Sequence, residues 1–190
     1  MPHVTQENIS IIDVDLLISE CIRANRGTSA FAYIISPFIS NFKIPAVLMK
    51  FTSNLINISD LERIGDLISM LVDLGGSVYV VTRSPVDLEQ TSISPSFIKK
   101  QAAILRQLHQ KGCKIRFNAR LHAKATVTSQ GAVSGSFNLT TSGRFLNLEE
   151  GNFFPNTEGE TMKQYKEKLA WAKDLFDSHS RPLVESDLRE

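Results

Sequence analysis

The sequence predicts an α/β fold in which a mixed β-sheet lies between helices on both faces. Strand-like and helix-like patterns alternate through the first two thirds of the chain, and short strand-like segments follow them. The 190 residues, 42% of them hydrophobic, suffice for one domain with a buried core, and no repeat or linker-like run divides them. We therefore expect a single domain over residues 1–180 and a polar tail at 181–190, which could lead to a further domain.

The first helix is predicted over residues 13–25, where apolar side chains recur at helical spacing. Asp13 is its expected N-cap, and the glycine at position 27 ends it. Residues 30–36 form an apolar, partly β-branched run that predicts a buried strand, and residues 44–51 predict another. The amino-terminal part therefore predicts one helix and two strands.

A second helix is predicted to begin at a capping box formed by Ser59 and Glu62 and to end at Gly75-Gly76. Ser94-Pro95 begins a third helix, because serine caps a helix and proline suits its first turn. The remaining strands are predicted at 78–82, 115–118, 121–128, 132–135 and 151–154, and a final helix is predicted between Met162 and Phe176.

Composition excludes several classes of protein. No secretory leader or apolar run of about 18 residues is visible, so we expect a cytoplasmic protein that does not span a membrane. The two cysteines, Cys21 and Cys113, belong to no Cys/His cluster, which predicts neither a disulfide framework nor a zinc site. We expect both to be reduced core residues.

Charge is distributed unevenly along the chain. The net charge is +1, yet residues 90–148 contain nine lysines and arginines and no acidic residue, so the rest of the chain carries −8. Such a cluster suits a polyanion, because a nucleic acid duplex presents a phosphate about every 1.7 Å along its axis. We expect Arg116, Arg120 and Arg144 from this segment to contact the substrate.

The most informative motif begins at His122 and Lys124. On extended backbone these side chains project to one face, so both can reach a single phosphate. The segment Gly135-Ser136-Phe137-Asn138 then offers amide and hydroxyl donors to the same anion. This set of groups handles a phosphate without a metal ion.

This window resembles the phospholipase D superfamily signature, in which His-x-Lys precedes Gly-Ser-x-Asn and a later Asn-x-Glu, here Asn147-Leu148-Glu149. Residues 33–38 resemble the family's opening strand and turn, and residues 78–83 resemble a second core strand. Two positions differ, because Ser129 stands where the family has Asp and the spacer to Gly135 is one residue short. Since Ser can keep a local hydrogen bond, we expect the scaffold to survive.

The resemblance implies an α-β-α sandwich and a phosphohistidine mechanism that needs no metal or other cofactor. His122 would attack phosphorus, Lys124 would neutralise the phosphate, and Asn138 and Ser136 would donate to its oxygens. Glu149 would hold a ring nitrogen of His122 and set its tautomer, although it could also be one of an exposed Glu pair. The family chemistry uses two histidines, so the single motif predicts a homodimer with one shared active site.

The leading interpretation is a metal-independent nuclease that acts on DNA or RNA, with DNA favoured, and that could be the cleavage domain or subunit of a restriction endonuclease. Sequence-specific cutting would require an additional recognition domain or subunit, because no base-reading element is visible. Two alternatives stay open. One is a phospholipase or phosphatidyl-transfer enzyme, and the other is a non-catalytic nucleic-acid-binding module with the same fold.

Overall fold

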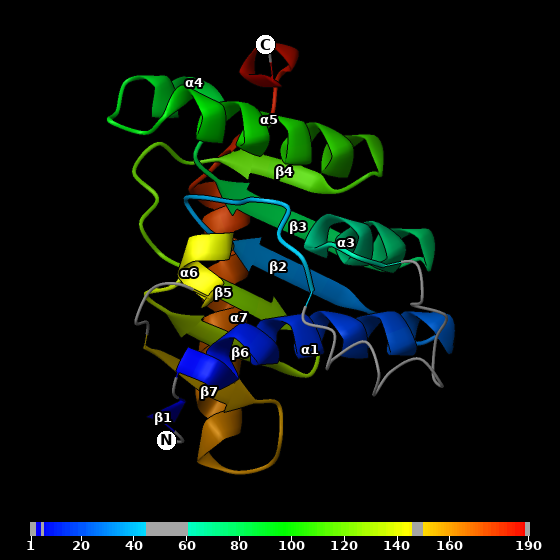
Figure 1. Ribbon diagram of the computed structural model, residues 1–190. Helices are drawn as coiled ribbons and strands as arrows, with labels where there is room; N and C mark the ends of the chain where they lie inside the picture. The colour runs from blue at the N-terminus through cyan, green and yellow to red at the C-terminus, as the bar shows by residue number, and fades with distance from the viewer. Residues whose placement is uncertain (1–2, 5, 45–60, 146–149, 189–190) are drawn as a thin grey trace.

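The computed structural model describes residues 3–4, 6–44, 61–145 and 150–188 (Figure 1). Its strands are β1 (His3–Val4), β2 (Phe31–Ile35), β3 (Ser77–Thr82), β4 (Lys114–Phe117), β5 (Ala125–Thr128), β6 (Gly131–Gly135), β7 (Gly151–Pro155) and β8 (Arg181–Pro182). Its helices are α1 (Gln6–Asn25), α3 (Ile64–Asp73), α4 (Pro85–Glu89), α5 (Pro95–Gln110), α6 (Thr141–Phe145), α7 (Glu160–Ser178) and the 3₁₀ turn η1 (Glu185–Leu188).

Within these residues the strands form one mixed sheet in the order β1-β7-β6-β5-β2-β3-β4-β8. Strands β2, β3 and β4 run parallel, whereas β5 is antiparallel to both of its neighbours, β2 and β6. The parallel strands are connected through helices, as a parallel crossover requires. The predicted α/β class with a mixed sheet is therefore confirmed.

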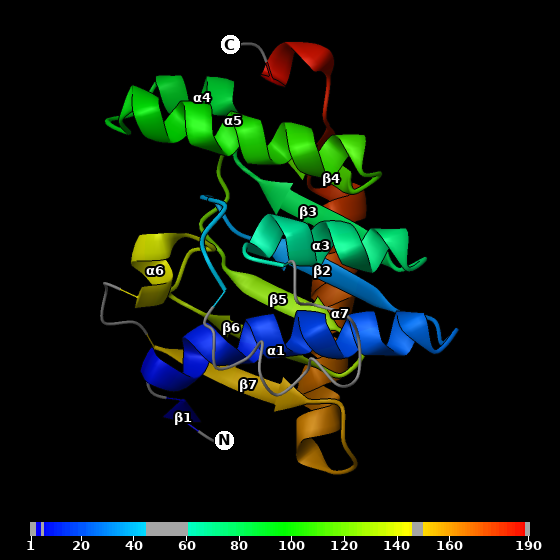
Figure 2. The same ribbon diagram turned by 45° about the vertical axis from the view of Figure 1, so that its right-hand side comes forward.

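Helices cover both faces of the sheet. Strand β2 shows why, because its alternate residues Ala32 and Ile34 enter one buried cluster while Tyr33 and Ile35 enter another. The first cluster includes residues of α1, α3 and α5, and the second includes residues of α7. The two views of the ribbon show these helices on opposite faces of the sheet (Figures 1 and 2). Among the described helices none has both the length and the apolarity to cross a bilayer.

Two predicted helix starts differ from the structure. Helix α1 begins at Gln6, because no glycine or proline interrupts the stretch before Asp13, and Asp13 is buried inside the helix instead of capping it. Helix α3 begins at Ile64, after an Arg63 whose backbone N–H donates to the Asp66 carboxylate at 3.1 Å. Ser59, the predicted cap, lies outside the described residues, as does nearly all of the strand predicted over 44–51.

Helix α5 begins where the sequence predicted, since the Ser94 hydroxyl accepts from the Phe97 N–H. The short helix α4 was not predicted. It begins at a capping box in which Ser84 Oγ accepts from the Asp87 N–H at 3.1 Å, and the Ser84 N–H donates to the Asp87 carboxylate at 3.2 Å.

The predicted polar tail is folded onto the domain as far as residue 188. Strand β8 pairs antiparallel with β4, which closes that edge of the sheet, and the Leu188 side chain is only 8% exposed. Arg181 donates two hydrogen bonds to Asp187, at 2.6 and 2.8 Å, and this pairing holds the turn in place. A polar composition thus concealed a packed segment.

Both cysteines lie in the core, as expected. Cys21 and Cys113 are unpaired and buried, and burial raises the pKa of each thiol to about 12. Neither thiol is therefore available as a thiolate nucleophile at neutral pH.

Candidate active site at one edge of the sheet

The topology brings the ends of five strands together on the side of the sheet where the parallel strands have their carboxyl ends. Parallel strands β2, β3 and β4 end there, and so does β6, because two antiparallel steps restore its direction. Strand β5 runs the other way and therefore begins at the same edge. The residues just before β5 and just after β6 are the two halves of the motif, so the fold places them next to each other.

His122 and Lys124 precede β5 instead of lying on it. The predicted strand 121–128 begins only at Ala125, which pairs with Ile35, the last residue of β2. Pro37 lies just beyond and has no N–H to extend the ladder. The Arg83 guanidinium holds the loop instead, donating to the Leu121 carbonyl at 2.9 Å.

The side chains of His122 and Lys124 are in contact although neither residue lies in a strand. The Lys124 Nζ atom lies 3.0 Å from Nδ1 of His122. Lys124 is 8% exposed, whereas His122 is exposed to solvent. Because an ammonium group can only donate, Nδ1 accepts in this contact, and a neutral ring then carries its proton on Nε2. The contact thus pairs a buried cation with an accessible imidazole.

The second half of the motif adjoins the first through its backbone. The Gly135 N–H donates to the Lys124 carbonyl at 3.2 Å. A side chain at Gly135 would collide with the backbone at Glu150 and Gly151, so the close approach of β6 and β7 requires glycine. Ser136 Oγ accepts from the Glu150 N–H at 3.2 Å and is exposed, which leaves it at the rim.

Asn138 is the part of the motif that the fold uses least. Its side chain is half-buried, and its Oδ1 atom is buried without a hydrogen-bond partner among the described residues. The neighbouring Leu139 N–H donates to Ser36 Oγ at 3.0 Å, which fixes this segment against the turn after β2. Because Oδ1 is buried and can only accept, a hydrogen bond from Asn138 to a phosphate would have to come from its side-chain N–H groups.

Ser129 lies at the opposite end of β5 from His122. Its N–H and hydroxyl both donate to one carboxylate oxygen of Glu20, at 2.9 and 2.5 Å, while the other oxygen accepts from the Phe31 N–H at 3.1 Å. Glu20 comes from α1 and is fully buried. A carboxylate is therefore present beside this strand end, but another element supplies it. The hydrogen bond of Ser129 is long-range rather than local.

The three arginines expected to bind substrate have different surroundings. Arg116 donates to the Ser180 carbonyl at 2.9 Å and lies 5.2 Å from the Phe176 ring, so the fold engages its guanidinium. Arg120 is exposed, and its guanidinium forms no hydrogen bond or ion pair within the described part of the chain. The side chain of Arg144 and the whole of Glu149 lie outside what the structure describes.

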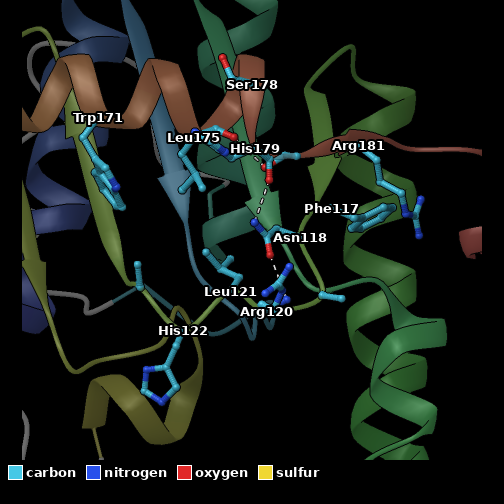
Figure 3. Close-up of a pocket in the computed structure, with 13 residues that line it drawn as sticks. Phe117, Asn118, Arg120, Leu121, His122, Trp171, Leu175, Ser178, His179 and Arg181 are labelled. Carbon is cyan, nitrogen blue, oxygen red and sulfur yellow. Dashed lines mark hydrogen bonds between the residues drawn. The ribbon is translucent and has the colours of Figure 1, made fainter.

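An open groove of about 860 Å³ begins beside His122 (Figure 3). The loop after β4 forms one wall, and the carboxyl-terminal half of α7 with the start of β8 forms the other. Asn118 joins the walls, since its side-chain amide donates to the His179 carbonyl at 2.7 Å. Sequence reasoning missed this groove and its residues Trp171 and His179, because no local motif marks them.

These groups can perform nucleophilic displacement at a phosphate. An accessible imidazole supplies the nucleophile, and the adjacent ammonium and amide can stabilise the charge of a phosphoryl transition state. The described residues contain no cluster of three or more His, Cys, Asp or Glu side chains that could hold a metal ion.

Comparison with known structures agrees with this fold. Nuc from Salmonella typhimurium, a phospholipase D family member, superposes with a TM-score of 0.55 at 15% identity over 90% of each chain. NucT from Helicobacter pylori superposes with a TM-score of 0.56 at 11% identity, covering 95% of this chain and 97% of NucT. At such identities the similarity establishes the fold.

A further structural match is TrmBL2, an archaeal chromatin protein with a novel mode of DNA binding. Its TM-score is 0.51 at 10% identity, and the match covers 95% of this chain and 52% of TrmBL2. The comparison with curated proteins gave no match. Residues 49–172 match the family described as "Cardiolipin synthase, PLD-like domain". Together with the fold and the adjoining motif halves, this match shows that the chain belongs to the PLD-like family of the phospholipase D superfamily.

Proposed function

We propose that the protein is a metal-independent phosphodiesterase that cleaves nucleic acid, with DNA preferred to RNA. The observation that carries the proposal is the 3.0 Å contact between the accessible His122 imidazole and the buried Lys124 ammonium, beside an open groove. The acid-free basic segment at 90–148 supports a polyanionic substrate. The groove agrees with it, because none of the described residues that line it is acidic.

The reaction proceeds in two displacements. A ring nitrogen of His122 attacks phosphorus, a P–N bond forms, and the bond to the leaving sugar oxygen breaks as a second imidazole protonates that oxygen. Water then attacks phosphorus and gives up a proton to this imidazole, the P–N bond breaks, and the second product leaves. Lys124 and Asn138 stabilise the charge on the non-bridging oxygens in both steps.

The contact between Lys124 and His122 must change when substrate binds. A phosphate oxygen is a stronger partner for the ammonium than an imidazole nitrogen, so we expect Lys124 to turn from Nδ1 to the phosphate. Nδ1 is then free to donate to a carboxylate, the role proposed for Glu149, which leaves Nε2 unprotonated for attack. Substrate binding would thereby switch the tautomer of the nucleophile.

The second imidazole is proposed to come from another copy of the chain. The described residues hold one copy of the motif, and a two-fold axis near His122 would supply an equivalent residue. Mixing wild-type protein with an equal amount of His122→Ala tests this. Random exchange of subunits would leave two histidines in only about a quarter of the dimers. Activity that stays proportional to the wild-type protein would refute a shared site.

The proposed function is tested by incubating the wild type and His122→Ala with labelled single- and double-stranded DNA, RNA and a phosphodiester lipid in EDTA. Cleavage of nucleic acid by the wild type alone supports the proposal, and a requirement for added Mg²⁺ contradicts it. Release of a lipid headgroup without nucleic acid cleavage supports the phospholipase alternative.

Binding of DNA without cleavage by both proteins would favour the non-catalytic module, the alternative that the fold of TrmBL2 makes concrete. A role as the cleavage part of a restriction endonuclease is a narrower form of the proposal. It requires a separate domain or subunit that reads base edges. Cutting at random positions by the isolated chain, and at defined positions with such a partner, would support it.

A further inference from the structure

The groove beside His122 contains an aromatic surface and an unpaired cation. Trp171 projects from α7 into the space between the helix and the loop, and Arg120 projects from that loop (Figure 3). The groove volume of about 860 Å³ lies in the range of sites that enclose organic ligands, roughly 300–1,000 Å³. It therefore has room for at least a nucleotide.

Trp171 is placed to present its ring. It is partly exposed and lies between two hollows, because it also lines a smaller one with Phe154 and Lys168. The Lys168 ammonium is 5.6 Å from the Trp171 ring and 5.7 Å from the Phe154 ring. A half-exposed indole in a groove is a surface on which an unpaired base can stack.

The basic side chains that line the groove differ in whether a carboxylate lies beside them. Arg181 is neutralised by its two hydrogen bonds to Asp187, and His179 lies 3.1 Å from the Asp174 carboxylate. Only Arg120, among the described cations that line the groove, has a guanidinium without such a partner. The position of Arg120, two residues before His122, suits a phosphate next to the one that reacts.

We propose that this groove is a nucleotide subsite in which Trp171 stacks on a base and Arg120 binds the phosphate neighbouring the scissile bond. The inference rests on the proposed function and narrows its substrate to unpaired nucleic acid. A duplex keeps its bases stacked on each other, and a single strand can turn one base onto the indole. Single-stranded substrates should therefore bind more tightly than duplexes of equal length.

The subsite can be read out directly, because Trp171 is the only tryptophan in the chain. His122→Ala, which cannot turn over, is titrated with oligothymidylate, and both tryptophan emission and the anisotropy of a label on the oligonucleotide are recorded. We expect quenching that saturates together with the anisotropy. Binding without any change in emission would overturn the subsite and leave the proposed function standing. Failure to bind any nucleic acid would overturn both.

Variants give a second test that does not depend on emission. Stacking of a base is worth about 1–3 kcal/mol, so Trp171→Ala should weaken oligonucleotide binding by about tenfold, and Trp171→Phe should retain most of the affinity. Arg120→Ala should weaken it further than Arg26→Ala, a matched loss of one exposed arginine at the far end of α1. Equal affinities for all four variants would contradict the proposal.

Discussion

The two ends of β5 differ in how accessible the polar side chains beside them are. At the amino-terminal end the imidazole of His122 is exposed, and the side-chain oxygen of Asn138 has no hydrogen-bond partner among the described residues. At the carboxyl-terminal end, three hydrogen bonds from Ser129 and Phe31 converge on the buried Glu20 carboxylate. Tyr165 adds a hydrogen bond from its hydroxyl to the Thr128 carbonyl at 2.7 Å.

The residues proposed to act on substrate and the residues that stabilise the fold therefore lie at opposite ends of β5, a strand of four residues. Buried polar groups whose hydrogen bonds are satisfied within the protein support the fold, whereas the exposed imidazole of His122 can be reached by a substrate. The pKa of Tyr165 follows the same division, since burial and then the nearby Glu20 carboxylate raise it. Substitutions at the two ends should accordingly affect different measurements.

The largest effect on activity is expected at the amino-terminal end of β5, beside His122. His122→Ala should lower the rate of phosphodiester cleavage about a thousandfold or more, because it removes the proposed nucleophile, and should leave the unfolding midpoint nearly unchanged. His109→Ala on α5 is the matched control and should cleave as the wild type does. Cleavage by His122→Ala, or an unfolding midpoint well below that of the wild type, would contradict this expectation.

Substitutions at the carboxyl-terminal end of β5 should instead lower the free energy of unfolding. Glu20→Ala removes the buried acceptor of three partly buried donors and should cost about 3 kcal/mol of unfolding free energy, measured by denaturant titration. Glu167→Ala, an exposed change on α7, should stay within about 0.5 kcal/mol of the wild type. If both variants unfold alike, Glu20 does not support the strand end.

A third test restores the acidic residue of the family pattern. Ser129→Asp would place a second carboxylate against the buried Glu20 and should destabilise the protein by about 2 kcal/mol at neutral pH. Repulsion between the two carboxylates and the burial of the second one supply this loss. Adding Glu20→Gln should recover much of the loss. A stabilised Ser129→Asp single variant would mean that the Glu20 carboxylate does not replace the family Asp.

The smallest effect concerns the carboxyl-terminal turn. Burial alone would raise the pKa of Asp187, but hydrogen bonds from Arg181 and the Val184 N–H hold it below its ordinary value. The pairing therefore contributes stability above the unfolded pKa and loses it as pH falls through the lower folded value. Because the Arg181 side chain is 48% exposed, water screens the pair and the contribution should be about 1 kcal/mol. The protection factor of the Val184 amide, its exchange rate relative to that of an unstructured peptide at the same pH, should fall in acid, and Asp187→Asn should remove this pH dependence.

Sequence reasoning succeeded where the signal is local. Strands β2 and β3 follow from their apolar runs, and α5 begins at its serine cap. The motif predicts that His122 and Lys124 act together, and the structure places them 3.0 Å apart, while their catalytic roles stay predictions. Sequence reasoning failed where a partner distant in sequence decides the outcome. The start of β5 depends on where β2 ends, and Ser129 donates its hydrogen bonds to Glu20, a residue 109 positions away. Trp171 joins the groove only after α7 packs on the sheet.

The pairing of β8 with β4 also limits open-ended association of one sheet with another. An uncovered outer strand presents a row of unused N–H and C=O groups on which another chain can build a continuing sheet. Here a two-residue strand occupies that row at Arg116 and Phe117, and its own Arg181 forms part of the groove wall. Loss of the β8–β4 pairing would therefore expose the outer strand β4 to other chains and at the same time remove one wall of the groove. Shortened versions that end before Arg181 should for this reason aggregate as well as lose substrate binding.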